Sequence, residues 1–283
     1  MDPSAALRDF LVSRRARLRP EDVGLAEQGP RRVAGLRREE VAALAAVSLD
    51  HYIRLERGQA SRVSDTVLQA VASALRLTSG ERRYLLALAR SGAARGADAK
   101  VDADAGTGVR PSVQSILDSL ADTPAYLVGR NGLLLAWNRP AVEVFLDFAE
   151  IPAPRRLIGR LVFGDPRSRL LYADWEAKAR EVVGFLRTQV GNRPHDPALA
   201  AHIRELLSIS ADFRRLWSAQ DVLERAHGSC CILHPTAGPL MLNYETLQPF
   251  DTPEKLLVVY AAEPGSASAA AVRELCARTR VAE

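Results

Sequence analysis

The chain has 283 residues, of which 47% are hydrophobic and 25% are charged. This length allows two domains of ordinary size, and the composition is that of a folded globular protein rather than of a disordered chain. Residues 1–20 carry charges throughout, and no apolar run approaches the roughly 18 residues that a membrane helix needs. These features argue against a signal peptide and a membrane partner, so we expect a cytoplasmic protein.

The excess positive charge lies in the first third of the chain. Residues 1–90 contain 16 basic side chains, all arginine, against 11 acidic ones, whereas the remaining residues contain 22 basic against 23 acidic. Arginine presents a planar guanidinium that forms two-point contacts with phosphate and guanine. A basic surface is also common among soluble proteins, so the charge permits a nucleic-acid partner without identifying one.

The cysteine pattern favours neither zinc nor disulfides. Cys230 and Cys231 are neighbours in an apolar run, Cys276 lies in a helical pattern, and none has zinc-ligand spacing. We expect them to act as small buried hydrophobic residues, with a redox switch as the alternative. No metal and no required cofactor are predicted.

Residues 1–90 are predicted to form an all-α domain of five helices. Ser64 and Ser79 are suitable N-caps, and Gly58 is a suitable helix stop. Apolar periodicity places the helices at residues 5–18, 38–45, 49–57, 64–75 and 79–89.

Residues 91–109 are predicted to be a linker, because they are dominated by Gly, Ala and Asp and lack apolar periodicity. Asp102, Asp104 and Gly106 resemble a calcium loop. The glycine is one position late, however, and no glutamate follows at the required distance, so calcium is not expected.

Residues 110–283 are predicted to form an α+β domain. The dipeptide Asn131-Gly132 signals a hairpin turn, the segment 240–247 alternates apolar with polar residues, and the uninterrupted apolar run at 256–261 indicates a central strand. Strands are expected at 125–128, 133–137, 230–234, 240–247 and 256–261. Helices are expected at 110–120, 140–148, 170–190, 197–207, 211–219 and 267–278. The prediction is a five-stranded antiparallel sheet with helices packed against it.

The segment 35–59, GLRREEVAALAAVSLDHYIRLERGQ, predicts a helix-turn-helix. Val41, Leu44 and Ala45 form a narrow inward stripe on the first helix, and Ala42 is small enough to let the next helix cross closely. Ser48 is positioned to cap the second helix. On that helix Tyr52 and Leu55 are expected in the core, with Glu56 in a structural ion pair with a nearby arginine.

The opposite face of the second helix is left for DNA. In this motif that face enters the major groove, so Arg54 is the expected guanine reader, while Arg37, Arg38 and Arg57 are placed for phosphates. The predicted DNA-binding residues are Arg37, Arg38, Ser48, Leu49, Asp50, His51, Ile53, Arg54 and Arg57. The alternative interpretation is an arginine-rich helical hairpin with a solvated face.

The sequence resembles the Xre-type regulators with an MmyB-like C-terminal domain. The matching stretches are Arg31 to Ala42, Leu55 to Gly58, Thr123-Pro124-Ala125, Ala136-Trp137-Asn138, Asp174-Trp175-Glu176, Ser210 to Arg214, Leu216-Trp217, Asp221-Val222, His234-Pro235 and Tyr260 to Ser266. The resemblance implies a dimeric transcription factor that binds double-stranded DNA as a homodimer. It also implies a PAS-like second domain that holds a small apolar ligand, with a fatty acid or similar molecule as the precedent.

Four positions depart from that family pattern. Ala46 stands where a glycine is usual in the turn, which costs on the order of 1 kcal/mol if its φ is positive. His51 and Ile53 replace the usual Tyr and Thr on the DNA face, so a family operator sequence does not transfer. Gln220 stands where a histidine is common.

A ligand of this kind needs an apolar tunnel and a few polar groups to fix its head. Arg187 and Arg214 are the candidate carboxylate partners, because arginine binds carboxylate bidentately. Their alternative roles are a solvated helix face or an ion pair with Asp174 or Asp221. The predicted ligand-binding residues are Trp137, Phe145, Phe163, Trp175, Leu186, Arg187, Phe213, Arg214, Trp217 and Met241. Each apolar one is equally compatible with simple core packing.

No catalytic residues are predicted. The chain lacks G-x-S-x-G, G-x-x-x-x-G-K and H-E-x-x-H motifs, and His195, His202, His227 and His234 are scattered without metal spacing. Three functions remain open from the sequence. They are a ligand-responsive transcription factor, a DNA-binding protein whose second domain only dimerises or recruits a partner, and an enzyme that autoregulates its own gene.

Overall fold

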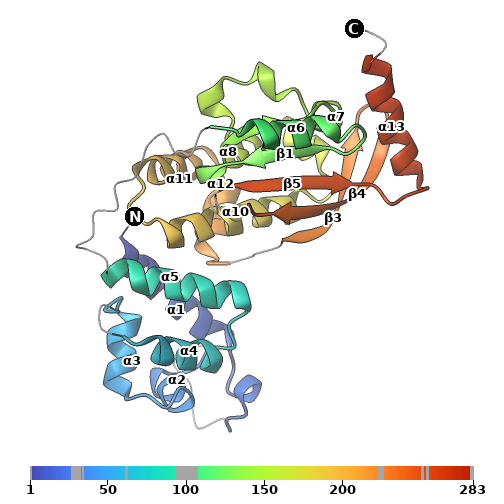
Figure 1. Cartoon of the computed structure of the whole chain (residues 1–283). Coiled ribbons are helices and arrows are strands. Elements are labelled where there is room, and N and C mark those ends of the chain that lie inside the picture. The colour runs from blue at the N-terminus through green and yellow to red at the C-terminus, as the bar shows by residue number, and fades with distance from the viewer. Residues whose placement is uncertain are drawn as a thin grey trace. The chain divides into compact units, whose positions relative to one another are not determined.

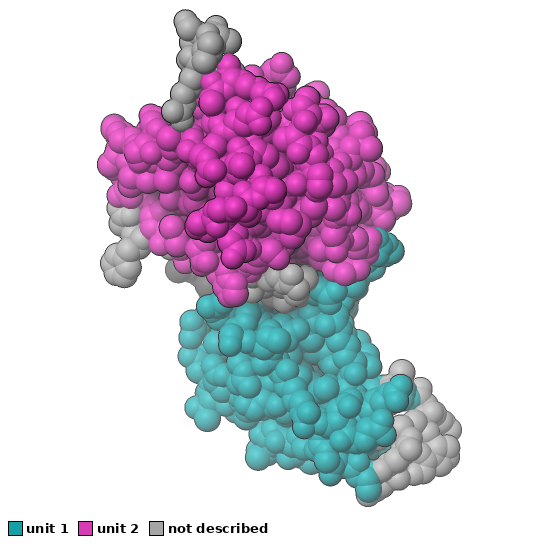
Figure 2. Space-filling view, turned by 90° about the vertical axis from the view of Figure 1, so that its right-hand side faces the viewer, with its two compact units in different colours: residues 1–99, 187–204, 215–224 teal, residues 100–186, 205–214, 225–283 magenta. Residues whose placement is uncertain are grey.

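The computed structural model in Figure 1 describes residues 2–26, 33, 35–60, 63–93, 108–221, 226–249, 252 and 255–280. Two units are distinguished in Figure 2: unit 1 comprises residues 1–99, 187–204 and 215–224, and unit 2 comprises residues 100–186, 205–214 and 225–283. Most of the predicted linker, 91–109, lies outside the described residues. So do Arg31, Arg32, Ala34 and Val222 from the stretches that carry the family resemblance.

The five helices predicted for the N-terminal part are all present in unit 1. They are α1 (Pro3–Arg17), α2 (Arg38–Leu44), α3 (Leu49–Glu56), α4 (Asp65–Ala74) and α5 (Ser79–Ala93), and a short 3-10 helix at Glu21–Val23 was not predicted. Helix α5 extends into the first three residues of the predicted linker. The core between the helices is apolar and includes the fully buried Phe10, Val41, Tyr52, Leu55 and Leu85.

The turn between α2 and α3 has the backbone geometry that favours glycine, yet it carries alanine. Ala46 has φ +52°. We expect Ala46→Gly to raise the free energy of unfolding by about 1 kcal/mol, because glycine adopts positive φ without steric cost. Urea unfolding measures this. Ala43→Gly, an exposed change inside α2, is the matched control and is expected to lower stability by about the same amount. A lower stability of the Ala46 variant would contradict the strain assigned to this turn.

Helix α3 ends where the sequence predicts. Gly58 has φ +86°, and a Cβ at this position would lie 2.3 Å from the backbone oxygen of Ser4 in α1. No residue with a side chain fits there without moving α1, so the glycine both ends α3 and allows close packing against α1.

Unit 2 contains the predicted five-stranded antiparallel sheet. Its strands are β1 (Ala125–Val128), β2 (Leu134–Trp137), β3 (His227–His234), β4 (Gly238–Leu247) and β5 (Leu256–Ala261), in the order β2-β1-β5-β4-β3. The apolar strand β5 is central, as expected. Asn131 and Gly132 turn the β1–β2 hairpin with φ of +62° and +81°. Strand β3 begins three residues earlier than predicted, because its first residues pair with the end of β4.

The two faces of the sheet differ in chemistry. Helix α6 (Pro111–Ser119) packs on β1, β2 and β5 through an apolar cluster that includes Leu117, Leu127 and Val259. On the other face, inward-facing tyrosines lie in register, with Tyr244 of β4 opposite Tyr260 of β5. Tyrosines therefore join the buried leucines Leu240 and Leu242 on this face of the sheet.

The helices after β2 differ most from the prediction. They are α7 (Arg139–Val144), α8 (Ile158–Gly164), α9 (Arg167–Leu171), α10 (Trp175–Asn192), α11 (Pro197–Ile209), α12 (Ala211–Ser218) and α13 (Ala267–Arg280). Helix α7 ends four residues earlier than predicted, and 3-10 turns follow at Phe148–Glu150 and Ala153–Arg155. Helix α8 was not predicted at all.

The prediction of a single helix at 170–190 is wrong, because the chain leaves helical geometry between α9 and α10. Tyr172 forms an isolated antiparallel bridge with Ile232, and the Ala173 amide donates to the Cys231 carbonyl. Asp174 then accepts the Ala177 amide at 2.8 Å and starts α10. Pairing with the edge strand β3 therefore overrides local helix propensity at three residues.

Among the described residues, none of the helices combines the length and apolar character that crossing a lipid bilayer requires.

Candidate DNA-binding surface and ligand cavity

Helix α3 presents one buried and one exposed face. It begins at Leu49 because the Ser48 hydroxyl accepts the His51 amide at 3.2 Å. Tyr52, Leu55 and Glu56 are buried, as the sequence predicts. The predicted DNA-facing residues of this segment lie on the other side: Ser48, Leu49, Asp50, Arg54 and Arg57 are exposed, and His51 and Ile53 are half-buried.

Glu56 fixes α3 against its neighbours through one buried carboxylate. Its Oε1 accepts from Arg15 Nε at 2.7 Å and from the Tyr52 hydroxyl at 3.4 Å, and its Oε2 binds Arg38 Nε. Burial, together with the charge of Glu56, raises the pKa of Tyr52. The predicted structural ion pair of Glu56 is therefore present, and it involves two arginines.

The arginines at the ends of α2 and α3 are paired with carboxylates of their own helices. Arg54 Nη2 lies 3.1 Å from Asp50 Oδ2, and Arg37 Nη1 lies 3.5 Å from Glu39 Oε1. Arg38 is 53% exposed although it binds Glu56. Arg37 and Arg38 lie at the N-terminal end of α2, and Arg54 lies in the last turn of α3.

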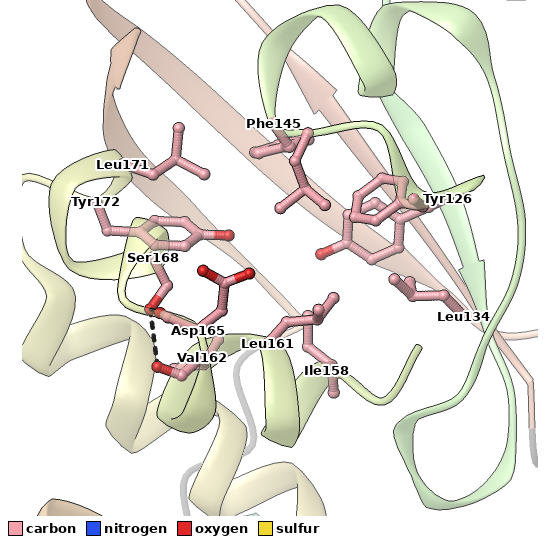
Figure 3. A pocket seen from close by; sticks show the side chains of 12 residues that line it. Tyr126, Leu134, Phe145, Ile158, Leu161, Val162, Asp165, Ser168, Leu171 and Tyr172 are labelled. Carbon is pink, nitrogen blue, oxygen red and sulfur yellow. Dashed lines mark hydrogen bonds between the residues drawn. The ribbon is translucent and has the colours of Figure 1, made fainter. Parts of the chain in front are cut away.

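Unit 2 contains a small interior cavity between the sheet and the segment α7–α9. Its volume is about 20 Å³. Figure 3 shows side chains from β1, β2, α8, α9 and the segment that follows α7 around it. The lining residues are Tyr126, Leu134, Phe145, Leu146, Phe148, Ile158, Leu161, Val162, Asp165, Ser168, Leu171 and Tyr172.

Three polar groups face this otherwise apolar cavity. The hydroxyls of Tyr126 and Tyr172 point toward each other from opposite walls, and the Asp165 carboxylate points into the space between them (Figure 3). Tyr126 hydrogen-bonds the Tyr260 hydroxyl at 2.9 Å, and Asp165 Oδ2 accepts from Arg167 Nη2 at 2.7 Å. The Ser168 hydroxyl also lines the cavity, but it donates its hydrogen bond to the Val162 carbonyl at 2.8 Å.

A buried ion pair lies behind the tyrosines. Lys178 of α10 is 7% exposed; its Nζ lies 2.8 Å from Glu181 Oε1 and 3.5 Å from the Tyr260 hydroxyl. Burial alone lowers the pKa of Lys178, but Glu181 and the neighbouring phenolic oxygens outweigh it and hold the pKa well above 10.5. Burial raises the pKa values of Tyr126, Tyr172 and Tyr260. The lysine is charged at neutral pH, and the tyrosines are protonated.

Of the ten predicted ligand residues, only Phe145 lines the cavity. Trp175 supports the wall, because its Nε1 donates to the Val162 carbonyl at 3.1 Å. Phe163 packs edge-on between Trp175 and the fully buried Phe213, and Trp137 packs edge-on against Phe148. These residues therefore form the layer around the cavity rather than its surface.

The remaining predicted ligand residues lie away from the cavity. Arg187 and Trp217 belong to unit 1, where the Arg187 guanidinium stacks on the Trp217 ring and donates to the Trp217 carbonyl and to Gln220 Oε1. Leu186 is fully buried on α10. Arg214 is exposed and donates to the Leu207 carbonyl at 2.6 Å, so neither arginine faces the cavity. Met241 is 55% exposed, because odd positions of β4 face outward.

The sequence prediction missed the polar groups of the cavity, namely Tyr126, Asp165, Tyr172 and the nearby Lys178. A signal existed for some of them. Tyr126, Tyr244 and Tyr260 occupy predicted strands, and Lys178 interrupts the apolar face of a predicted helix. No comparable signal marks Asp165 or Tyr172, because both lie where α8 and the α9–α10 break were not predicted.

The model of the MmyB-like transcription regulator ligand-binding domain matches residues 109–275, which is more than half of the chain. The chain belongs to the MmyB-like transcription regulator family. The match contains every residue of the cavity and the Lys178–Glu181 pair. No curated protein matches this MmyB-like regulator. Within its described ranges, no group of three His, Cys, Asp or Glu side chains is placed to hold a metal ion.

Proposed function

We propose that this MmyB-like regulator binds promoter DNA as a homodimer, with α2 and α3 as an Xre-type helix-turn-helix, and that a small apolar ligand in unit 2 modulates the binding. The proposal includes no catalytic step. The proposal is supported by two features of the same chain. One is the match to the ligand-binding domain of a transcription regulator family, and the other is helix α3, whose buried face is held by the Glu56–Arg15 ion pair and whose exposed face carries Arg54.

The energetics of Arg54 favour its use on DNA. In the free protein it pairs with Asp50 on the exposed surface, and such pairs contribute at most about 1 kcal/mol. A bidentate contact of arginine with guanine in the major groove gives about 1–3 kcal/mol of base discrimination. The guanine contact therefore outweighs the ion pair that it replaces.

Arg54→Ala is expected to reduce the preference for the operator over random DNA by about 10- to 100-fold, with a smaller loss of affinity for random DNA. Fluorescence anisotropy with both DNAs at one salt concentration measures this. Arg90→Ala is the matched control, because Arg90 also forms an exposed ion pair, with Asp65 at 2.8 Å, but lies on α5. Equal losses in the two variants would show that α3 does not read bases.

Ligand binding requires unit 2 to change shape. A volume of about 20 Å³ takes about one water molecule, whereas sites for drug-sized ligands span about 300 Å³ or more. A fatty-acid-like chain therefore enters only if the segment around Phe145, Ile158 and Leu161 separates from the sheet. We infer that this opening is the structural change by which the ligand acts.

Homodimer formation provides the two-fold symmetry that helix-turn-helix regulators use on DNA. Two copies of α3 then read half-sites about one helical turn apart. Analytical ultracentrifugation of the full chain with and without a palindromic operator tests this part of the proposal.

A further inference from the structure

The Tyr172 hydroxyl is a hydrogen-bonding group that the protein leaves for another molecule. Tyr172 is 9% exposed, and its hydroxyl points into the cavity (Figure 3). Within the described part of the chain, this hydroxyl has no hydrogen-bond partner. Because this hydroxyl can both donate and accept, a molecule in the cavity can form a hydrogen bond with it.

Asp165 adds a negative charge to the lining of the cavity. Its carboxylate lines the cavity, and Arg167 binds it from outside through Nε at 3.1 Å and Nη2 at 2.7 Å. The hydrogen bonds from Arg167 lower the pKa of Asp165, so the carboxylate is ionised at neutral pH. Asp165 therefore offers acceptors to the cavity and repels a second anion.

Among the residues that the structure describes, no lysine or arginine lines this cavity to receive an anionic head group. Lys178 lies behind the tyrosines with its charge matched by Glu181, and Arg167 directs its guanidinium to Asp165. Arg187 and Arg214 donate to backbone carbonyls elsewhere. A ligand carboxylate beside Asp165 would lose its hydration and meet a like charge, which costs several kcal/mol.

We propose that the ligand of unit 2 carries a neutral head group that both donates and accepts hydrogen bonds, as the hydroxyl of a long-chain alcohol or the amide of an acyl amide does. The head donates to the Asp165 carboxylate and accepts from the Tyr172 hydroxyl. The aliphatic chain lies toward Phe145, Ile158 and Leu161. This inference rests on the proposed ligand-binding function and specifies its ligand class.

The size of the cavity agrees with this assignment. A space of about 20 Å³ takes one water molecule, which also donates and accepts. A hydroxyl or amide head can form both kinds of hydrogen bond in such a space, whereas a carboxylate cannot donate to Asp165.

Isothermal titration calorimetry of the full chain with tetradecan-1-ol, tetradecanamide and tetradecanoate at pH 7.5 tests the proposal. The chain length is the same, so only the head group differs. We expect the two neutral ligands to bind at least about tenfold more tightly than tetradecanoate. Asp165→Asn should bring the three affinities within about threefold of each other, and Tyr172→Phe should weaken the neutral ligands about tenfold.

Asp212→Asn is the matched control, because Asp212 also pairs with a nearby arginine, Arg169, but does not line the cavity. It should retain the wild-type order of affinities, and melting temperatures establish that each variant is folded. Tighter binding of tetradecanoate by the wild type would overturn the neutral head group and leave ligand binding intact. Binding of none of the three ligands would overturn both this inference and the proposed ligand response.

Discussion

Glu56→Ala is expected to lower the free energy of unfolding of the N-terminal helices by about 3–5 kcal/mol. The Glu56 side chain is 2% exposed and Arg15 is 11% exposed, so removal of the carboxylate leaves a buried guanidinium without its counter-charge. The Tyr52 hydroxyl loses its acceptor at the same time. Urea unfolding followed by circular dichroism measures the change.

Arg38→Ala separates this structural role from the role proposed on DNA. Arg38 binds the same carboxylate but is half-exposed, and Arg15 remains to pair with Glu56. We expect a loss of less than about 1 kcal/mol in stability together with weaker binding to every DNA and a shallower salt dependence. If the two variants lose equal stability, the buried Arg15–Glu56 pair does not anchor α3.

Glu181→Ala is expected to destabilise unit 2 by a similar amount, about 3–5 kcal/mol at pH 7. Its partner Lys178 is buried beneath the sheet tyrosines and would keep a charge with no opposite charge beside it. Lys178→Met is the matched control, because it keeps the apolar stem and leaves Glu181, which is 27% exposed, in contact with water. We expect Lys178→Met to lower the free energy of unfolding by about 1 kcal/mol or less.

The stability lost on Glu181→Ala is expected to depend on pH in one direction. In the wild type the pKa of Lys178 is raised above 10.5, so the stability that this group contributes is present below pH 10.5 and is lost as pH rises through the folded-state pKa. Without Glu181, we expect burial to dominate, because the other neighbouring groups are tyrosines that stay uncharged below pH 10, and we expect the folded-state pKa of Lys178 to fall below 10.5. The deficit of the variant should then shrink between pH 7 and pH 10. A deficit that does not change with pH would contradict the assignment of the cost to buried Lys178.

The sequence predicted the elements whose signals are local. Five N-terminal helices, the Asn131-Gly132 hairpin and the central strand β5 follow from capping residues, turn residues and apolar periodicity, and all are present. The inner face of α3 was also predictable, because Tyr52, Leu55 and Glu56 recur at helical spacing and all are buried.

The features that the sequence did not predict depend on contacts between distant residues. Tyr172 leaves helical geometry because it pairs with Ile232, which lies 60 positions further along the chain. Asp165 faces the cavity because α8 and α9 meet there. Arginine was the expected carboxylate partner on chemical grounds, but Arg187 binds the Trp217 carbonyl and Gln220. The residue types in a sequence can suggest a ligand class, whereas tertiary packing determines which polar side chains face the ligand.

The most direct test of the account is selection of DNA from a random pool by the full chain, followed by anisotropy titration of the selected sequence with and without tetradecan-1-ol at about 0.15 M salt. We predict binding at least about 1,000-fold tighter than to random DNA, and a change of about fivefold or more when the alcohol is added. Enrichment of no sequence, with equal affinity for every DNA, would contradict the proposed regulator.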